Sequence, residues 1–277
     1  MRMKQTSGAV LVHAILLTYT VIALYPIFLV IINSFKARKA IFGSPMALPN
    51  ADTFSLVGFT KVLEKAHFEL YFGNSLFVTV ITLALVLLAG AMAAWALAEY
   101  RFPGNTLLGL YLAIGIMVPI RLGSVSILQL IVDLNLINTL TALILVYTAQ
   151  SLPLAIFILS EFIRLIPKDL IEAARCDGVN EYKIFFAIIL PLIRPAIATV
   201  GMFTMVPVWN DLWFPLILAP GEKTQTVTLG VQQFIGQYVT DWNAVLASLT
   251  LAIVPILILY LLFSRQMIRG ITSGAVK

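Results

Sequence analysis

The chain has 277 residues, of which 60% are hydrophobic and only 11% are charged, and its formal net charge is +5. Its mean hydropathy is +0.98. A soluble globular chain carries about a quarter charged residues, and even a folded protein leaves much of its surface in contact with its solvent. The composition therefore excludes a water-soluble fold and indicates an integral membrane protein with lipid as its solvent.

The cysteine and histidine content excludes several classes of site. A single cysteine, Cys176, rules out a disulfide framework and a multi-cysteine metal site. His13 and His67 lie far apart in the sequence without a carboxylate or cysteine cluster nearby, so we predict no metal site. The positive net charge requires no nucleic acid, because basic residues at the cytoplasmic ends of membrane helices give the same balance.

Six largely apolar stretches are predicted to cross a membrane as helices, for which about 20 residues are needed. The fifth stretch runs 16 residues from Pro195 before it meets Asp211. The charge-free stretch between Gln5 and Phe35 exceeds the roughly 7–15 apolar residues of a cleavable signal, so we predict that it is a retained helix. Residues 122–132 are apolar but short, which indicates an interfacial or re-entrant segment. The predicted spans, within a single transmembrane domain over residues 1–277, are 10–32, 74–98, 105–120, 139–162, 195–219 and 244–264.

The distribution of Lys and Arg predicts that both termini lie in the cytoplasm, because cytoplasmic loops are enriched in these residues. In this orientation 11 of the 18 basic residues lie inside and 7 outside. Lys36, Arg38 and Lys39 lie just outside the first span and count against this orientation.

The longest polar interruption between spans, residues 166–191, predicts a surface helix, a tight turn and a second helix. Pro167 suits the first position of a helix. Gly178 suits the left-handed residue that follows a helix terminus. Asn180 can start a second helix, which is expected to stop at Pro191. Leu170, Ala173 and Ala174 recur at helical spacing and predict a low apolar face that another helix or backbone can approach closely.

The same segment contains Glu172-Ala173-Ala174, Asp177-Gly178 and, after nine intervening residues, Ile188 followed by Leu190-Pro191. This pattern resembles the EAA loop of permeases in ABC importers of the binding-protein-dependent type. An ordinary interfacial helix hairpin explains the helix and the glycine, but not the whole pattern at its place between the fourth and fifth predicted spans.

A second segment, Trp209-Asn210-Asp211-Leu212-Trp213, resembles the fifth helix of the carbohydrate-uptake branch, the MalG-like permeases of maltose transporters. The segment 226–230, Asp241-Trp242 and Pro255 also fit that branch.

The resemblance implies an all-α fold, the six-helix transmembrane domain of a type I ABC importer with a cytoplasmic coupling helix in the loop 165–191. It also implies a bacterial-type inner membrane location. The implied partners are a second permease subunit, two ATPase subunits and an extracytoplasmic solute-binding protein. The residues implied to couple to the ATPase are Glu172, Ala173, Ala174, Asp177 and Gly178. Those implied to contact the binding protein are Gly230, Gln232 and Gln233.

A solute pathway is expected around Asp211, which lies roughly 24 Å along a helix from Pro195. A carboxylate at that depth must face a cavity, a partner or the headgroups. The candidate pathway residues are Trp209, Asn210, Asp211, Gln150 and Ser151, with Trp213 as a further aromatic face. An interfacial aromatic belt also explains the tryptophans, and hydrogen bonds between helices also explain Gln150 and Ser151. Arg121 is expected to contact lipid headgroups.

The sequence contains no phosphate-binding loop, since the glycine pair Gly104 and Gly109 continues with Leu110-Tyr111 where Lys and Ser or Thr are needed. No catalytic residue, metal or cofactor is expected on this chain, and ATP and magnesium belong to the partner ATPase subunits.

The predicted function is therefore that of a permease subunit in an ATP-driven sugar importer. A secondary carrier would need intramembrane ionisable groups, and an intramembrane enzyme would need two catalytic groups at one depth. An amino acid or peptide as solute is disfavoured only by the resemblance.

Overall fold

In the computed structural model the chain is built from helices joined by loops, and residues 2–65, 67–235 and 240–275 are described. The extended pairings among these residues are two isolated bridges, Lys36 with Phe54 and Ile235 with Thr240. The chain divides into two compact units, Met1–Glu69 with Gly230–Val254 and Leu70–Leu229 with Pro255–Lys277.

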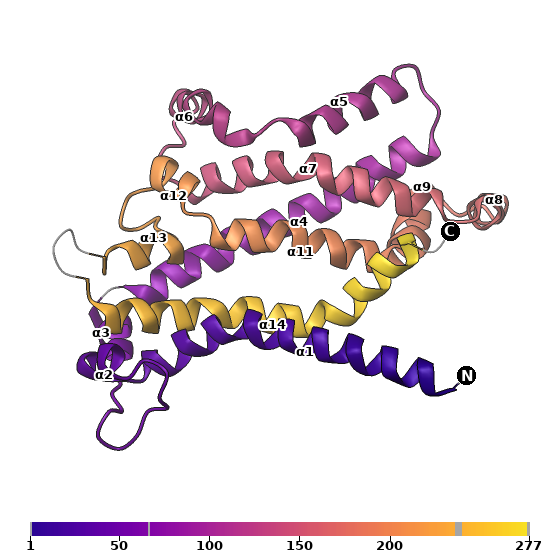
Figure 1. Cartoon of the computed structure of the whole chain (residues 1–277). Coiled ribbons are helices and arrows are strands. Elements are labelled where there is room, and N and C mark those ends of the chain that lie inside the picture. The colour runs from indigo at the N-terminus through magenta and orange to yellow at the C-terminus, as the bar shows by residue number, and fades with distance from the viewer. Residues whose placement is uncertain (1, 66, 236–239, 276–277) are drawn as a thin grey trace. The chain divides into compact units, whose positions relative to one another are not determined.

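The first unit carries a buried lysine without a carboxylate partner among the described residues. The Nζ of Lys36 donates to Oδ1 of Asn33 at 3.0 Å and to the carbonyl of Ser44 at 2.9 Å. The side chain of Asn243 donates to the carbonyl of Lys36 at 2.7 Å. These bonds satisfy polar groups that would otherwise be costly to bury. The helices of this unit are α1 (Arg2–Ser34), α2 (Arg38–Gly43), α3 (Val57–Lys65) and the beginning of α14 (Trp242–Ala275) (Figure 1).

The second unit is a bundle in which α7 packs on both α5 and α11 (Figure 1). Its longer helices are α4 (Phe68–Glu99), α5 (Asn105–Met117), α6 (Ser124–Asp133), α7 (Leu140–Arg164) and α11 (Arg194–Asn210). Its shorter helices are α8 (Lys168–Cys176), α9 (Glu181–Ile184), α10 (Leu190–Leu192), α12 (Trp213–Leu218) and the first half of α13 (Val227–Gln232), and it also includes α14 from Pro255 onward. A 3₁₀ turn (Ile120–Gly123) precedes α6, and a π turn (Phe185–Ile189) precedes α10.

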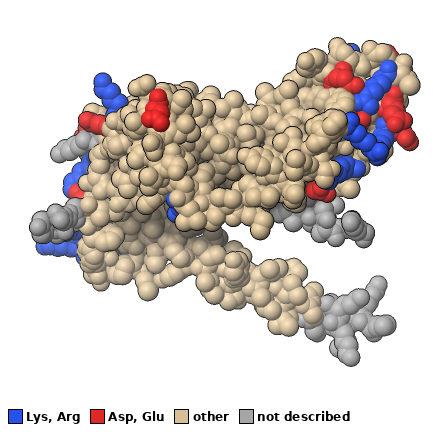
Figure 2. Space-filling view, turned by 90° about the horizontal axis from the view of Figure 1, so that it is seen from above, with Lys and Arg blue, Asp and Glu red and all other residues tan. Residues whose placement is uncertain are grey.

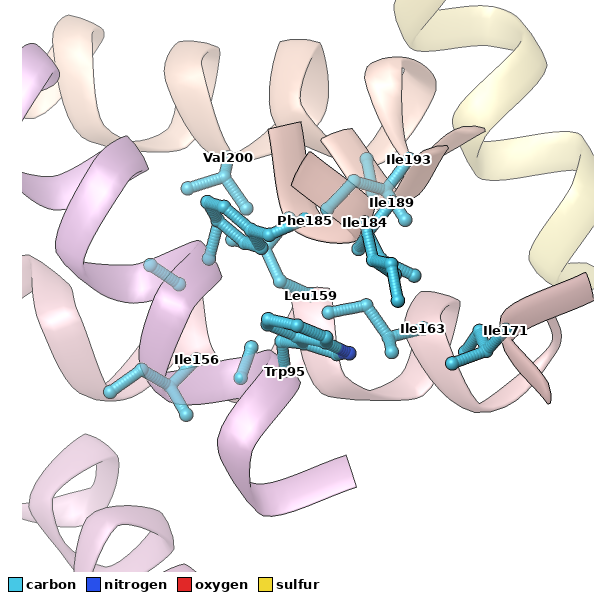
Figure 3. Close-up of a cluster of buried hydrophobic side chains, with 14 of the residues drawn as sticks. Trp95, Ile156, Leu159, Ile163, Ile171, Ile184, Phe185, Ile189, Ile193 and Val200 are labelled. Atoms are coloured by element: carbon cyan, nitrogen blue, oxygen red, sulfur yellow. The ribbon is translucent and has the colours of Figure 1, made fainter. Parts of the chain in front are cut away.

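Apolar side chains from α4, α7, α8, α11 and the segment of α9 with the π turn meet in a core at one end of this bundle (Figure 3). Leu159 of α7 is fully buried at its centre. The ring of Trp95 from α4 stacks on that of Phe185, with centroids 5.3 Å apart. Ile171 of α8 belongs to the same cluster. The short helix α8 is therefore held by the core of the bundle and not only by its neighbours in sequence.

Among the described residues, three continuous helices are long and apolar enough to cross a membrane: Gly8–Ser34, Phe68–Glu99 and Leu140–Arg164. Two further candidates are pairs of helices with a bend, Asn105–Met117 with Ile120–Asp133 at 86° and Glu181–Leu192 with Arg194–Asn210 at 77°. A shorter apolar helix covers Trp242–Ile258. Each of these six features overlaps a predicted span.

The third predicted span, 105–120, is shorter as a helix than the sequence suggests. Helix α5 ends at Met117, and Val118 is extended with φ −79° and ψ 118°. A residue that precedes proline is sterically driven out of the helical region, and Pro119 follows here. The proline therefore produces the bend between α5 and α6.

The second helix of segment 166–191 does not stop at Pro191, contrary to the sequence prediction. In the π turn before it, the backbone N–H of Leu190 donates to the carbonyl of Phe185, five residues earlier. This wider turn shifts the hydrogen-bond register and relieves the clash that a proline ring makes with the carbonyl four residues before it. The helix consequently continues to Leu192, and the 77° bend follows.

Replacing Leu159 with Ala is expected to destabilise the bundle, because it leaves a cavity in a packed core and costs about 2–5 kcal/mol. Thermal unfolding of the purified protein in detergent measures the change. Phe157→Ala, on the same helix, is the matched control, since Phe157 is 53% exposed and its removal opens no cavity. Equal losses of stability for the two variants would contradict the assigned core.

Candidate functional site

Helix α8 presents one face to the bundle and the other to its surroundings. Ile171 and Ala174, three residues apart, are buried against the core, whereas Glu172 and Ala173 are exposed. Leu170 is 47% exposed. The apolar face predicted from the sequence is therefore split, because Ala174 packs inward while Leu170 and Ala173 face outward. The outward side is small and partly apolar.

The turn after α8 has the predicted geometry. Gly178 has φ +73°, a conformation that residues with a side chain rarely adopt. Its N–H donates to the carbonyl of Arg175 at 3.0 Å. Asn180 caps α9 by accepting a hydrogen bond from the backbone N–H of Lys183 at 2.8 Å. Pro167 is the N-cap of α8 instead of its first helical residue. Asp177 is exposed at the turn.

Arg175 joins α8 to two other helices, and the sequence analysis missed this contact. Its Nε donates to Oε1 of Glu181 at 2.7 Å, and its Nη1 donates to Oε1 of Glu99 at 2.8 Å. The hydroxyl of Tyr100 donates to Oε2 of Glu181 at 2.6 Å. The hydrogen bond to Glu181 raises the pKa of Arg175. We refer to Arg175, Glu181, Glu99 and Tyr100 as the Arg175 cluster.

Charged side chains gather at the end of the second unit that α8 and α9 form, whereas the stretch along its long helices shows almost none (Figure 2). This distribution is typical of a bundle whose long helices lie in lipid and whose end lies in water. The segment 166–191 therefore projects from the apolar part of the bundle.

A second site is built around the break between α11 and α12. The predicted fifth span, 195–219, is not one helix: α11 ends at Asn210, and Asp211 is extended with ψ 134°. The Asp211 carboxylate accepts a hydrogen bond from the backbone N–H of Phe214 at 3.0 Å and thereby caps the start of α12. It also accepts the hydroxyl of Tyr147 at 2.9 Å. The carboxylate therefore stabilises the interruption of the helix.

Asp211 lines a pocket with a volume of about 240 Å³. The pocket brings together four of the five predicted pathway residues, namely Gln150, Ser151, Asn210 and Asp211. The side chains of Gln150 and Ser151 have no hydrogen-bond partner in the described part of the chain. Their polar groups are available to a molecule in the pocket.

Two further polar residues line this pocket, and the sequence did not predict this role for either. The Nη2 of Arg121 lies 3.4 Å from Oδ1 of Asp211, although the Arg121 side chain is 69% exposed. Arg121 was expected at the headgroups alone. Tyr147 lines the same pocket. Their separation in sequence from Asp211, by 90 and 64 residues, explains why spacing could not reveal them.

Of the two tryptophans, Trp209 differs from the expectation and Trp213 does not. Trp209 is 2% exposed, and its ring lies edge-on to Phe72 at 5.6 Å, because its side of α11 faces the bundle interior. It offers no open ring face for stacking. Trp213 is 41% exposed, and its Nε1 donates to Oγ of Ser124 at 2.8 Å.

The residues expected to contact a binding protein lie at the end of α13. Gln232 and Gln233 are exposed, whereas Gly230 is buried. Among the described residues, no group of three or more His, Cys, Asp or Glu side chains is placed to hold a metal ion.

Comparison with known proteins places the chain in a family. Residues 86–273 match the model of the binding-protein-dependent transport system inner membrane component. The chain is 33% identical over 268 residues to the diacetylchitobiose uptake system permease protein NgcG of Streptomyces coelicolor, with 96% of this chain and 88% of the relative covered. It is 33% identical to the arabinooligosaccharides transport system permease protein AraQ of Halalkalibacterium halodurans, with 92% of each chain covered.

Among solved structures, a chain of a bacterial ABC transporter involved in the import of the acidic polysaccharide alginate has the same fold. The TM-score is 0.79 at 22% identity, and 96% of this chain and 98% of that chain are covered.

The family model covers most of the chain, and the relatives match it almost from end to end. The predicted permease family and the all-helical membrane fold are therefore confirmed, and so is the prediction that the chain has no nucleotide site or cofactor of its own, because this family of permeases has none. The chain belongs to the inner membrane components of binding-protein-dependent transport systems, and it is a multi-pass permease subunit of an ABC importer that works with a binding protein.

Proposed function

We propose that this permease subunit imports saccharides and that the pocket at Asp211 lies on their path. The observation that carries the proposal is the gathering of hydrogen-bonding side chains that a polyhydroxy solute can use, Gln150, Ser151 and Asn210, beside a carboxylate that is balanced by Arg121. The permease relatives are named for the uptake of diacetylchitobiose and arabinooligosaccharides. A neutral, hydroxyl-rich molecule suits such a lining better than a charged one, because Asp211 and Arg121 already neutralise each other.

The complete importer comprises this chain, a second permease subunit, two ATPase subunits and an extracytoplasmic binding protein. Both termini lie in the cytoplasm, and the chain crosses the membrane six times as one transmembrane domain. The excess of Lys and Arg in the segments that this orientation places inside, 11 of 18, supports it, and α8 then lies in the cytoplasm, where ATP is available. Gln232, the last residue of α13, and Gln233 after it are exposed and face the binding protein, and the carbonyl of Gly230 accepts the N–H of Gln233 at 3.1 Å.

Helix α8 is the coupling helix that docks on an ATPase subunit. Its outward face, with Glu172 and Ala173, is exposed and low enough for close packing. Its inward face, with Ala174, is anchored in the core. Asp177 and Gly178 set the turn that leads to α9. A helix held on one side and open on the other can carry a displacement from a partner into the bundle.

Replacing Glu172 with Lys is expected to abolish uptake while membrane insertion persists, because it reverses a charge on the docking face. Copurification of the ATPase subunits and solute uptake into reconstituted vesicles measure the effect. Glu64→Lys is the matched control, since Glu64 is an exposed residue of α3, and normal uptake is expected. If Glu172→Lys binds the ATPase subunits and transports normally, α8 is not the docking element.

Replacing Gln150 with Ala is expected to raise the KM for solute uptake about fivefold, since one hydrogen bond contributes roughly 1 kcal/mol. Binding of the ATPase subunits stays unchanged. The control is Gln129→Ala on α6, where the side chain is exposed and outside the pocket. An unchanged KM for Gln150→Ala together with Asn210→Ala would remove the pocket from the solute path.

A further inference from the structure

The Arg175 cluster ties α8 to a helix that is remote from it in sequence. Glu99, the last residue of α4, precedes Arg175 by 76 residues, and its carboxylate is 14% exposed. A hydrogen bond between two charged groups is about twice as strong as a neutral one, and partial burial reduces its screening by water. The covalent connections of α8 lead instead to α7 and α9, through residues 165–167 and 177–180. The bond to Glu99 therefore gives α8 a separate attachment to α4.

Helix α4 is suited to carry a displacement along its length. It is continuous from Phe68 to Glu99 and contains no proline. The distance from Asn74 to Glu99 corresponds to about 37 Å of helix. About two thirds of the way along, a Cβ placed on Gly90 would lie 3.2 Å from the Cβ of Ala155 on α7, so the two helices touch closely and sideways bending of α4 is restricted.

The far end of α4 holds the segment 223–228. The side-chain amide of Asn74 donates to the carbonyls of Lys223 at 3.0 Å and Gln225 at 2.9 Å. The hydroxyl of Ser75 accepts the N–H of Val227 at 2.9 Å. Asn74 and Ser75 are 7% and 3% exposed, so these bonds are shielded from solvent.

The same segment is bonded to the break at Asp211. The hydroxyl of Thr228 donates to the backbone carbonyl of Asp211 at 2.6 Å. One continuous helix therefore ends at the Arg175 cluster on one side and, on the other, at the segment that fixes the backbone of the pocket. Energetic coupling between distant sites travels through such packed elements and hydrogen-bond networks.

We propose that Arg175 is a positioning residue that passes the displacement of α8 into α4 through Glu99, and that α4 carries it to segment 223–228 and so to the pocket at Asp211. This inference rests on the proposed function of α8 as the coupling helix. It adds a transmission path through α4 that runs beside the covalent path through α7 and α9.

The test uses the assembled transporter, reconstituted in vesicles with its ATPase subunits and binding protein. With Glu99→Gln, the ATPase subunits still copurify and ATP hydrolysis stays close to that of the unchanged transporter. Solute uptake per ATP hydrolysed falls about tenfold or more, because one partner of a partly buried charge pair is lost. Arg175→Lys retains the positive charge but loses the planar guanidinium that bonds Glu99 and Glu181 together. Uptake per ATP therefore also falls in this variant.

The far end of α4 provides an independent arm. Asn74→Ala combined with Ser75→Ala is expected to lower uptake per ATP in the same way, although both residues are remote from α8 in the helix. The matched control is Glu161→Gln, which removes the carboxylate that Arg164 binds at 2.7 Å within α7 and is expected to leave uptake per ATP unchanged.

The outcomes separate the inference from the proposed function. Normal uptake per ATP in Glu99→Gln overturns the path through α4. Loss of the ATPase subunits in both Glu99→Gln and Arg175→Lys also overturns it, since the cluster then only shapes the docking face. If Glu172→Lys leaves ATPase binding and uptake unchanged while Glu99→Gln lowers uptake per ATP, the result contradicts the proposed function of α8 as the coupling helix.

Discussion

The constraint on which this structure depends is that backbone N–H and C=O groups in a membrane find no water to bond. Each unsatisfied group costs several kcal/mol in hydrocarbon, so the chain is helical wherever it lies in lipid, and every interruption has to be satisfied by the protein itself. The interruption at Asp211 illustrates the solution. The carboxylate of Asp211 accepts a hydrogen bond from the backbone N–H of Phe214, and the backbone carbonyl of Asp211 accepts one from the hydroxyl of Thr228.

This constraint also explains why a polar pocket forms where it does. A helix break inside the bundle requires polar side chains to satisfy it, and those side chains come from elements far apart in sequence, such as Tyr147 of α7 and Arg121 before α6. The same groups line the cavity next to the break. A continuous α11–α12 helix would bond its own backbone and would have no need of Asp211. The polar lining is thus a consequence of the break.

The sequence predicted what depends on local chemistry. The turn at Gly178, the cap at Asn180 and the position of α8 follow from residue types at short spacing, and the structure agrees with them. Gln150, Ser151, Asn210 and Asp211 were expected to share a pathway, and they line one pocket. The end of the second helix at Pro191 was predicted wrongly, because a π turn can accommodate a proline and hydropathy does not register such a turn.

The sequence could not reveal contacts that depend on packing. Trp209 was expected to present a ring face to the solute. Whether its side chain is buried depends on the side of α11 on which it lies, and in the structure that side faces Phe72. The bond between Arg175 and Glu99 links positions 76 residues apart, with no periodic pattern between them. Local patterns therefore identify the element that docks and the residues that line the pocket. The connections appear only in the structure, where α4 bonds to Arg175 at one end and to segment 223–228 at the other.

A membrane bundle is well suited to such a connection, since association between its helices relies on close packing and hydrogen bonds more than on the hydrophobic effect. Near α8, the contact that α4 makes outside the apolar core is the ion pair between Glu99 and Arg175. It lies among other charged residues, as expected for an end of the bundle in water. Near the pocket, the contacts of α4 are neutral hydrogen bonds from buried Asn74 and Ser75. Each end of α4 thus uses the type of bond that its surroundings favour, because ions are costly to bury and neutral hydrogen bonds gain strength where water is absent.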